Sequence, residues 1–435
     1  MRKVVITGYG VVSPVGNSTR DTWSALMSCR SGLGPITYFD ASTFPTRIAG
    51  EVKNFDFWKL WADTGSRYPL PKSVSQSGKL AVIAALEAWA HAGLDKHRMA
   101  KDRAGIYLGA GKGEGLGELE FIGAFMPQCF KADGSLDIGK FLAEARNRAD
   151  EGLENEVEPG RIMCHLAEIL GAHGPVSTCL TACAAGAQAV GEAMRFIRED
   201  EADVMIAGGC HSMITPQSIM GFCLLGALST DNDNPLKASR PFTKNRDGFV
   251  LSEGAALLVL EEEQHAKKRG AKILGELAGY GCTSDAFRVT DPHPEGIGQS
   301  GAIRRCLKDA GVEPDVVDYI NAHGTSTADN DESETIAIKK VFGDRAYKIP
   351  VSSTKSMTGH LIAAAGSLEA IICSLAIQHG VVPPTINYEE VDPACDLDYV
   401  PNRPREARIR TALSNSFGFG GQNTSLLIRE YARDR

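Results

Sequence analysis

Short runs of β-branched residues alternate along the chain with segments whose apolar residues recur at helical spacing. RKVVITG at 2–8 and RAGIYLGAG at 103–111 have the composition of strands. KLAVIAALEAWAHAGL at 79–94 lies between them and has the period of a helix. This alternation predicts an α/β protein built from layers of sheet and helix.

The same succession of segments occurs twice. Three pairs of segments echo one another in the same order: 4–13 with 274–284, 87–111 with 303–324, and 183–187 with 364–368. Because the order is shared, we expect two similar halves that meet near residue 270, which divides the chain into residues 1–270 and 271–435. The first half carries the candidate nucleophile and the second half carries both candidate histidines.

The first half is longer than the second, and its excess falls at about 112–160. This stretch ends in the acidic run ADEGLENEVEPG and has few apolar residues after Leu142. A segment of that composition cannot bury a core of its own. We therefore expect a solvated insertion rather than a separate domain.

Composition narrows the class of protein. Of the 435 residues, 43% are hydrophobic and 23% are charged, as in ordinary soluble globular proteins, and a net charge of −8 gives no support to nucleic-acid binding. We see no apolar run of membrane-spanning length and no secretory signal. Eleven cysteines, an odd number without framework spacing, indicate reduced thiols and predict a cytoplasmic protein.

Cys183 is the candidate nucleophile. It lies at a turn in STCLTACAAGAQAV that runs directly into a helical pattern, among small residues such as Ala182 and Gly186. Unpaired N–H groups and the positive end of the helix dipole lower the pKa of a thiol at such a turn. The ordinary alternative is a small buried cysteine, and Cys179, which lacks this setting, fits that alternative.

His323 and His360 lie on loops at the ends of predicted strands. His323 follows the apolar segment VVDYI, and His360 lies at a strand-to-helix junction with Lys355 five residues before it. Loops on a rigid scaffold often carry chemistry, although each histidine could equally be an ordinary loop residue or a helix cap.

Together, a thiolate and two imidazoles suit carbon–carbon bond formation on thioesters. The thiolate holds an acyl group covalently, and neutral imidazoles donate hydrogen bonds to the enolate that forms as carbon dioxide leaves a malonyl unit. Lys355 adds positive charge, and no metal or redox cofactor is needed. Adjacent Cys-His pairs at 164–165 and 210–211 do not form a metal-ligand set, and GAGKGEGLG at 109–117 fits neither phosphate-loop pattern.

The chain resembles the β-ketoacyl-acyl-carrier-protein synthase II family, which are ketosynthases of the thiolase superfamily. Five motifs carry the resemblance in order: TACAAG at 181–186, RPFTKNRDGFVLSEGA at 240–255, NAHGTST at 321–327, STKSMTGH at 353–360 and NSFGFGGQN at 415–423. The similarity runs from VVITGYGVVSPVGN near the start to the end of the chain. It implies a thiolase-like five-layer αβαβα fold of two pseudo-repeated halves, usually a homodimer.

The resemblance also implies roles for the catalytic residues. Cys183 becomes the acylated nucleophile, and His323 and His360 promote decarboxylation and stabilise the enolate. Lys355 supports this pair of histidines, and Glu334 is their structural carboxylate partner.

Further residues are implied to bind substrate. Thr325 and Thr327 match the threonines that contact the phosphopantetheine arm of an acyl-carrier protein, and Phe222 matches a residue that lines the acyl pocket. Phe419 matches a gating phenylalanine, and its backbone N–H joins that of Cys183 in the oxyanion hole. The substrates are carried on phosphopantetheine, and the enzyme needs no cofactor of its own.

Two features depart from the family pattern. Lys112, with Glu114 beside it, stands where relatives have an apolar residue at the wall of the acyl pocket. Either the local backbone differs from that of relatives, or the unpaired charge disfavours long saturated chains and the substrate tail is short or polar. Gly226 and Asp231 occupy a segment where relatives often carry arginines that dock the acidic carrier protein. The cationic residues that would compensate are Arg67, Lys72, Lys79 and Lys237.

Several related classes of enzyme differ from this sequence in their catalytic residues. Thiolases use a second cysteine near the C-terminus, which NSFGFGGQN lacks, and priming ketosynthases replace one histidine by asparagine. The remaining alternative is a catalytically weak partner subunit of the chain-length-factor type, which lacks the nucleophile and would form a heterodimer. The sequence therefore predicts a decarboxylating condensing enzyme and leaves fatty-acid and polyketide pathways open.

Overall fold

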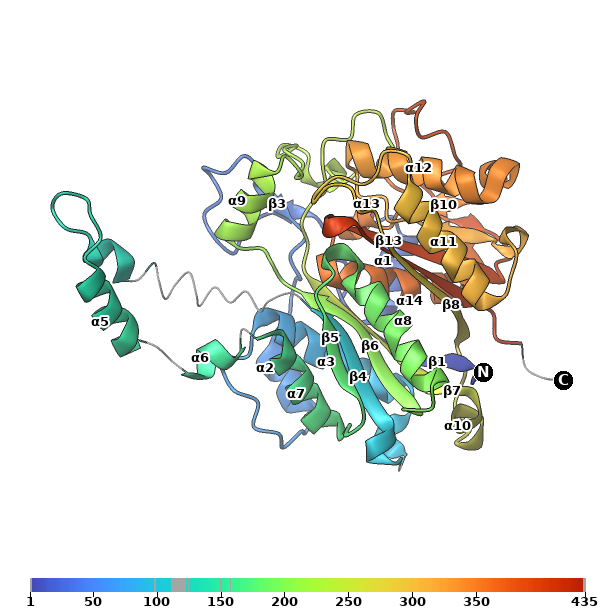
Figure 1. Ribbon diagram of the computed structural model, residues 1–435, viewed down its shortest axis with the longest axis horizontal. Helices are drawn as coiled ribbons and strands as arrows, with labels where there is room; N and C mark the ends of the chain where they lie inside the picture. Colours follow the sequence, from blue (N-terminus) through green and yellow to red (C-terminus); the bar gives the residue numbers. More distant parts are fainter. Residues whose placement is uncertain are drawn as a thin grey trace.

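A computed structural model describes residues 2–97, 99–110, 123, 125–148, 151–156 and 158–432. Its strands form one ten-stranded mixed sheet with helices on both faces (Figure 1). The strands of this sheet are β1 Val4–Val12, β4 Ala104–Ala110, β5 Val176–Cys179, β6 Val204–His211, β7 Gly254–Glu262, β8 Gly275–Ser284, β9 Tyr319–Asn321, β10 Val351–Ser352, β13 Thr411–Gly418 and β14 Gln422–Arg429. Two short ribbons pair β2 Gly34–Pro35 with β3 Ile48–Ala49 and β11 Val381–Val382 with β12 Arg405–Glu406.

The described helices all fall between β1 and β14 in the chain. The α-helices are α1 Thr19–Met27, α2 Phe57–Asp63, α3 Gln76–His91, α5 Ile138–Arg148, α6 Glu151–Glu156, α7 Pro159–Leu170, α8 Ala185–Arg198, α9 Pro216–Leu224, α10 Glu263–Lys268, α11 Ile297–Ala310, α12 Ala328–Phe342, α13 Lys355–Thr358 and α14 Ala365–His379. Short 3₁₀ turns that matter below are η3 Met126–Cys129, η4 Ala182–Ala184, η6 Pro314–Val316, η8 Ile362–Ala364 and η9 Phe419–Gly421.

The sheet consists of two halves with the same strand order. From edge to centre, the first half runs β5-β4-β6-β7-β1 and the second runs β10-β9-β13-β14-β8. In each half the three outer strands are parallel and the two inner strands are antiparallel. The halves meet where Val5 pairs with Glu276 and Ile6 with Gly275. The predicted duplication is confirmed.

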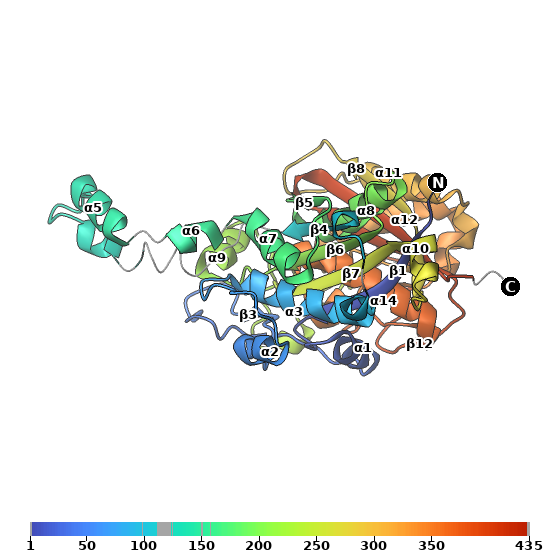
Figure 2. The same cartoon turned by 90° about the horizontal axis from the view of Figure 1, so that it is seen from below.

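The helices complete the predicted αβαβα layering. α8 and α14 pack against each other and contact strands of both halves, so they form the central layer. α3 covers β1 and β7 on one outer side, and α11 covers β8 and β14 on the other. Figure 2 shows the layers from a second direction.

The Gly-Tyr-Gly sequence that occurs in both halves has a physical reason. A Cβ atom at Gly8 or Gly10 of β1 would overlap backbone atoms of α3, and one at Gly279 or Gly281 of β8 would overlap backbone atoms of α11. Each glycine pair thus lets an alanine-containing helix approach its central strand closely. The echo reflects the same helix-on-strand contact made twice.

The turns before α8 and α14 also match. Ala182 has φ 48° and Ile362 has φ 50°, a left-handed conformation that is rare for such residues. Each is the first residue of a 3₁₀ turn that leads directly into the helix. Cys183 therefore corresponds to Ala363 in the second half. The echo seen in the sequence pairs Cys183 with Ala364, one residue later.

The described part of the 112–160 stretch forms η3, α5, α6 and the start of α7. In Figures 1 and 2, α5 lies well away from the body of the molecule. It has no buried residue of its own. This agrees with a solvated insertion.

Within the described part of the chain, one helical segment has the length and apolarity needed to cross a membrane, contrary to the expectation from sequence. It is Ile362–His379, and 83% of it is buried inside the protein. It coincides with η8 and the central helix α14, so its apolar character is explained by its place in the core.

Candidate active site

Cys183 lies in η4, immediately before α8, where it is 6% exposed. The backbone N–H groups of Cys183 and Phe419 both approach its sulfur and stabilise negative charge there. Gly418 permits this approach, because a Cβ atom on it would come within 3.1 Å of the Cys183 nitrogen. The turn therefore has the geometry of an oxyanion site beside the thiol.

The net effect on the thiol differs from the expectation. Burial raises the pKa of Cys183 to about 11, although Lys355 and the two N–H groups act in the opposite direction. Desolvation disfavours the charged form more than these groups favour it. Cys183 is therefore a thiol at neutral pH, and its activation requires transfer of the proton.

His323 follows β9 and is held through its backbone. Glu334 on α12 accepts hydrogen bonds from the N–H groups of His323 (2.9 Å) and Gly324 (2.8 Å), and Asn415 donates to the same carboxylate at 3.2 Å. Glu334 thus fixes the loop rather than the imidazole. Nδ1 of the buried His323 ring has no hydrogen-bond partner in the part of the chain that the structure describes.

His360 follows Gly359, which has φ 66°, and is tied to the strand segment beside β7. Its N–H donates to Val250 and its carbonyl accepts from Ser252. Nδ1 of the ring accepts a hydrogen bond from the N–H of Ile362 at 3.3 Å. In a neutral imidazole this places the proton on Nε2, which has no partner among the described atoms and is free to donate to a substrate.

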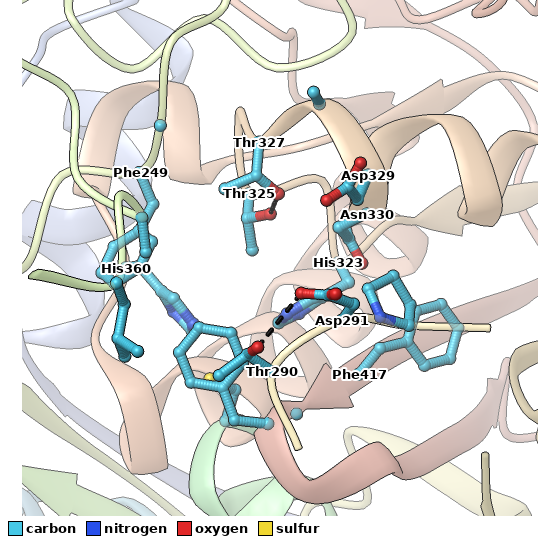
Figure 3. Close-up of a pocket in the computed structure, with 18 of the residues that line it drawn as sticks. Phe249, Thr290, Asp291, His323, Thr325, Thr327, Asp329, Asn330, His360 and Phe417 are labelled. Atoms are coloured by element: carbon cyan, nitrogen blue, oxygen red, sulfur yellow. Dashed lines mark hydrogen bonds between the residues drawn. The ribbon is translucent and has the colours of Figure 1, made fainter. Parts of the chain in front are cut away.

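The thiol and the two imidazoles converge at one cavity (Figure 3). The sulfur and one ring nitrogen from each histidine lie within 4.8 Å of one another, and the centroids of the two rings are 5.3 Å apart in an edge-to-face arrangement. The cavity measures about 280 Å³ and extends to the exposed residues Ala328 and Asp329, so the sulfur is reachable from solvent. The structure thus brings together residues from both halves.

Both imidazoles are neutral in this environment. Burial lowers the pKa of His323 well below its ordinary value, and the positive charge of Lys355 lowers it further. Burial and Lys355 act in the same direction on the pKa of His360. Neutral rings of this kind can donate a hydrogen bond or accept a proton, as the chemistry predicted from sequence needs.

Lys355 is paired with a residue that sequence reasoning missed. Its ammonium contacts the carboxylate of Glu369 on α14, and both side chains are 2% exposed. Burial raises the pKa of Glu369 to about 7, while Lys355 opposes this shift. Glu369 therefore keeps the cation in place beside the thiol and the imidazoles.

The predicted substrate-binding residues fall into three groups. Thr325 and Thr327 line the cavity, and their hydroxyl groups are hydrogen-bonded at 2.8 Å (Figure 3). Phe419 lines the cavity as well, and the ring of Phe222 lies 6.3 Å from it in an apolar cluster that includes Cys183. Lys112 lies outside the described residues.

The catalytic candidates Cys183, His323 and His360 are also close enough together to ligate a metal ion. Cys183, His323 and His360 offer one sulfur and two nitrogens, all buried. Metal would occupy the sulfur that has to be acylated, so the two uses exclude each other. The expectation that no metal takes part remains a prediction.

A buried thiol beside two neutral imidazoles, on a duplicated αβαβα scaffold, defines a condensing enzyme of the thiolase type. Residues 1–266 match the model of the β-ketoacyl synthase N-terminal domain, and residues 274–389 match that of the β-ketoacyl synthase C-terminal domain. The chain belongs to the β-ketoacyl synthase family.

Individual relatives support the same family assignment. The chain is 45% identical to 3-oxoacyl-[acyl-carrier-protein] synthase 2 of Coxiella burnetii, over 98% of each chain. It is 44% identical to the Synechocystis protein of the same name, over 99% of this chain and 98% of the relative. The protein is thus a condensing acyltransferase, and this reading is favoured over a chain-length-factor subunit.

Solved structures show the same fold. A ketosynthase structure described as a type II polyketide acyl-carrier protein in complex with its ketosynthase has a TM-score of 0.88 at 35% identity, covering 99% of this chain and 100% of that one. The ishigamide ketosynthase/chain length factor has a TM-score of 0.86 at 37% identity, with the same coverage.

Proposed function

We propose that the protein loads an acyl chain onto Cys183 and lengthens it by decarboxylative Claisen condensation with a malonyl unit held by an acyl-carrier protein. The observation that carries this proposal is the convergence of Cys183, His323 and His360 at one solvent-reachable cavity. The names of the relatives support the reaction class.

In the loading step, the sulfur of Cys183 attacks the carbonyl carbon of a thioester on the phosphopantetheine arm. Because the buried thiol is protonated at neutral pH, a neutral imidazole beside it accepts the proton as the C–S bond forms. The N–H groups of Cys183 and Phe419 donate to the oxyanion. The arm then leaves as a thiol and takes that proton, which restores the neutral ring.

In the condensation step, His360 donates Nε2–H to the carbonyl oxygen of the malonyl thioester. The C–C bond to the carboxylate breaks and carbon dioxide leaves. The electron pair of that bond stays on the malonyl unit and forms an enolate that the imidazoles and Lys355 stabilise. The enolate carbon attacks the acyl group on Cys183, and the C–S bond breaks with its electron pair on sulfur. The sulfur then takes up one proton from solvent in the cavity, because the loss of carbon dioxide supplies none. We assign Thr325 and Thr327 to the arm because their hydroxyl groups face this cavity.

Mass spectrometry of peptides tests the loading step. Enzyme incubated with acyl-loaded carrier protein, without malonyl donor, is expected to gain the mass of the acyl group on the peptide that contains Cys183. Addition of malonyl-loaded carrier should then remove the adduct and release a β-ketoacyl product. An adduct on any other cysteine, or none, would contradict the proposal.

We further propose that the protein works in the cytoplasm, in fatty-acid or polyketide synthesis, as a homodimer. All eleven cysteines are free, which suits a reducing compartment. β5 is an edge strand of the sheet; the apolar Val176 at its start is 42% exposed, and Leu180, directly after its end, is 57% exposed. An exposed apolar edge favours pairing with a second copy. Exposed Ile138 and Leu142 on α5 suit the same partner.

Val176→Lys is expected to shift the protein from dimer to monomer, because it places a charge at that edge. Size-exclusion chromatography with light scattering measures the mass. Val316→Lys, on η6 before β9, is the control that should leave the dimer intact. A wild-type monomer that dimerises only with a second ketosynthase-like chain would favour the heterodimer instead.

A further inference from the structure

The mouth of the active-site cavity is acidic. Among the described residues that line it, the charged ones are one arginine and four aspartates, namely Arg246, Asp247, Asp285, Asp291 and Asp329. The arginine is not available to a partner, because its side chain is 5% exposed and is paired with Asp392. Asp247 pairs with Arg240, and Asp291 pairs with Arg288, whose side chain is 67% exposed on the same rim. Asp285 and Asp329 have no cationic partner among the described residues, so an acidic docking face would meet their like charges at this mouth.

The cations predicted to replace the missing docking arginines do not neutralise the acidic mouth of the cavity. None of Arg67, Lys72, Lys79 and Lys237 lines the described part of the cavity. Lys237 is bound to Glu389, and Asp231, which stands where relatives have an arginine, is bound to Arg240. Electrostatic attraction thus gives an acidic carrier little hold on this rim.

Apolar side chains surround the same mouth. We define a rim patch of Met220, Leu224 and Leu225 at the end of α9 and Phe287 and Val289 on the loop between β8 and α11. Their exposed fractions are 40%, 81%, 55%, 47% and 79%. Such exposure of large apolar residues usually marks an interaction site.

The patch is continuous with the catalytic cavity on both sides. Leu225 itself lines the cavity, and the loop contributes the next residues, Thr290 and Asp291, to its wall (Figure 3). The carbonyl of Val289 accepts a hydrogen bond at 2.6 Å from the N–H of Gly420, which follows Phe419. Any partner that threads a substrate arm to Cys183 must therefore rest on these side chains.

We infer that the rim patch is the docking surface for an acyl-carrier protein whose binding face is mainly apolar, so that the complex is held by hydrophobic contact rather than by ion pairs. The inference rests on the proposed function. Leu224 and Val289, one on each side of the mouth, are the most exposed members and the expected anchors. The guanidinium of Arg288 lies 5.4 Å from the centroid of the Phe287 ring, and the His293 ring is tilted against the same ring at 5.0 Å.

The test compares carrier-bound and carrier-free substrates. With the malonyl-loaded acyl-carrier protein of the same organism, the double variant Leu224→Ser/Val289→Ser is expected to raise KM by about tenfold or more while kcat is kept. With the malonyl thioester of N-acetylcysteamine, which has no protein to dock, its kinetics should match those of the unmodified enzyme. Val316→Ser, an exposed apolar residue on η6, is the matched control.

Salt dependence gives a second readout. For the unmodified enzyme, KM for the carrier should change by less than about twofold between about 0.05 M and about 0.5 M salt, because hydrophobic contact is not screened. A steep rise of KM with salt, or an unaltered KM in the double variant, would overturn the inference. So would loss of the dimer in the double variant, since the patch would then contact a second copy.

Failure of the proposed function looks different. In that case neither carrier-bound nor small thioesters would leave an acyl adduct on Cys183. Failure of the docking inference alone would leave both reactions in place.

Discussion

Cys183→Ala is expected to reduce condensation by at least about 1,000-fold, because no other group can hold the acyl chain. Phe419 and the histidines remain, but without the sulfur there is no acyl-enzyme for the enolate to attack. The measurement is release of β-ketoacyl product from acyl- and malonyl-loaded carrier. The variant should fold normally, since the residues beside it in η4 are alanines already.

Cys179→Ala is the matched control. Cys179 is also buried and lies four residues upstream, but its Sγ donates to the carbonyl of Ala185 instead of facing the cavity. It should retain full turnover. Appreciable activity in Cys183→Ala, or equal losses in both variants, would mean that another residue carries the acyl group.

His360→Ala is expected to lower the rate of condensation by about 100- to 1,000-fold, the range observed when one donor to a developing oxyanion is removed. The reason is geometric: Ile362 fixes the ring so that Nε2–H faces the cavity. The acyl adduct on Cys183 should still form. Turnover and adduct formation, measured separately, distinguish the two steps.

His323→Ala is expected to give a comparable loss, and the exposed His97→Ala should give none. If His360→Ala instead blocked formation of the adduct while released carbon dioxide stayed normal, His360 would act in loading rather than in decarboxylation. The order of the two steps would then have to be reassigned between the rings.

Local signals predicted much of this site. Small residues around Cys183 indicated a tight turn before a helix, and apolar segments before His323 indicated a loop at a strand end. Both expectations depend on neighbours in sequence, and the structure agrees with them. The catalytic roles themselves stay predictions until the variants are measured.

Effects that depend on packing could not be predicted. The helix position of Cys183 indicated a lowered pKa, whereas burial by segments far apart in the chain raises it. Glu369 was missed because it lies on the apolar helix α14, where nothing in the sequence links it to Lys355. Glu334 was expected to partner both histidines, whereas its described hydrogen bonds reach only the first of them, through the backbone N–H groups of His323 and Gly324.

The division at residue 270 and the effect of Lys112 on chain length also stay predictions. β7 and β8 fall on either side of that boundary, with α10 and a connecting segment between them. The predicted effect of Lys112 is tested by measuring the turnover of long saturated acyl chains.

The left-handed turns at Ala182 and Ile362 occupy equivalent places in the two halves, but only the first is followed by a cysteine. In the second turn the counterpart of the nucleophile, Ala363, is 2% exposed, and its carbonyl lies against Gly186 and Gly209. A thiol introduced there would face packed backbone rather than substrate. Although the fold is repeated, only the first of these two turns places a nucleophile at the cavity, and the second is packed inside the protein.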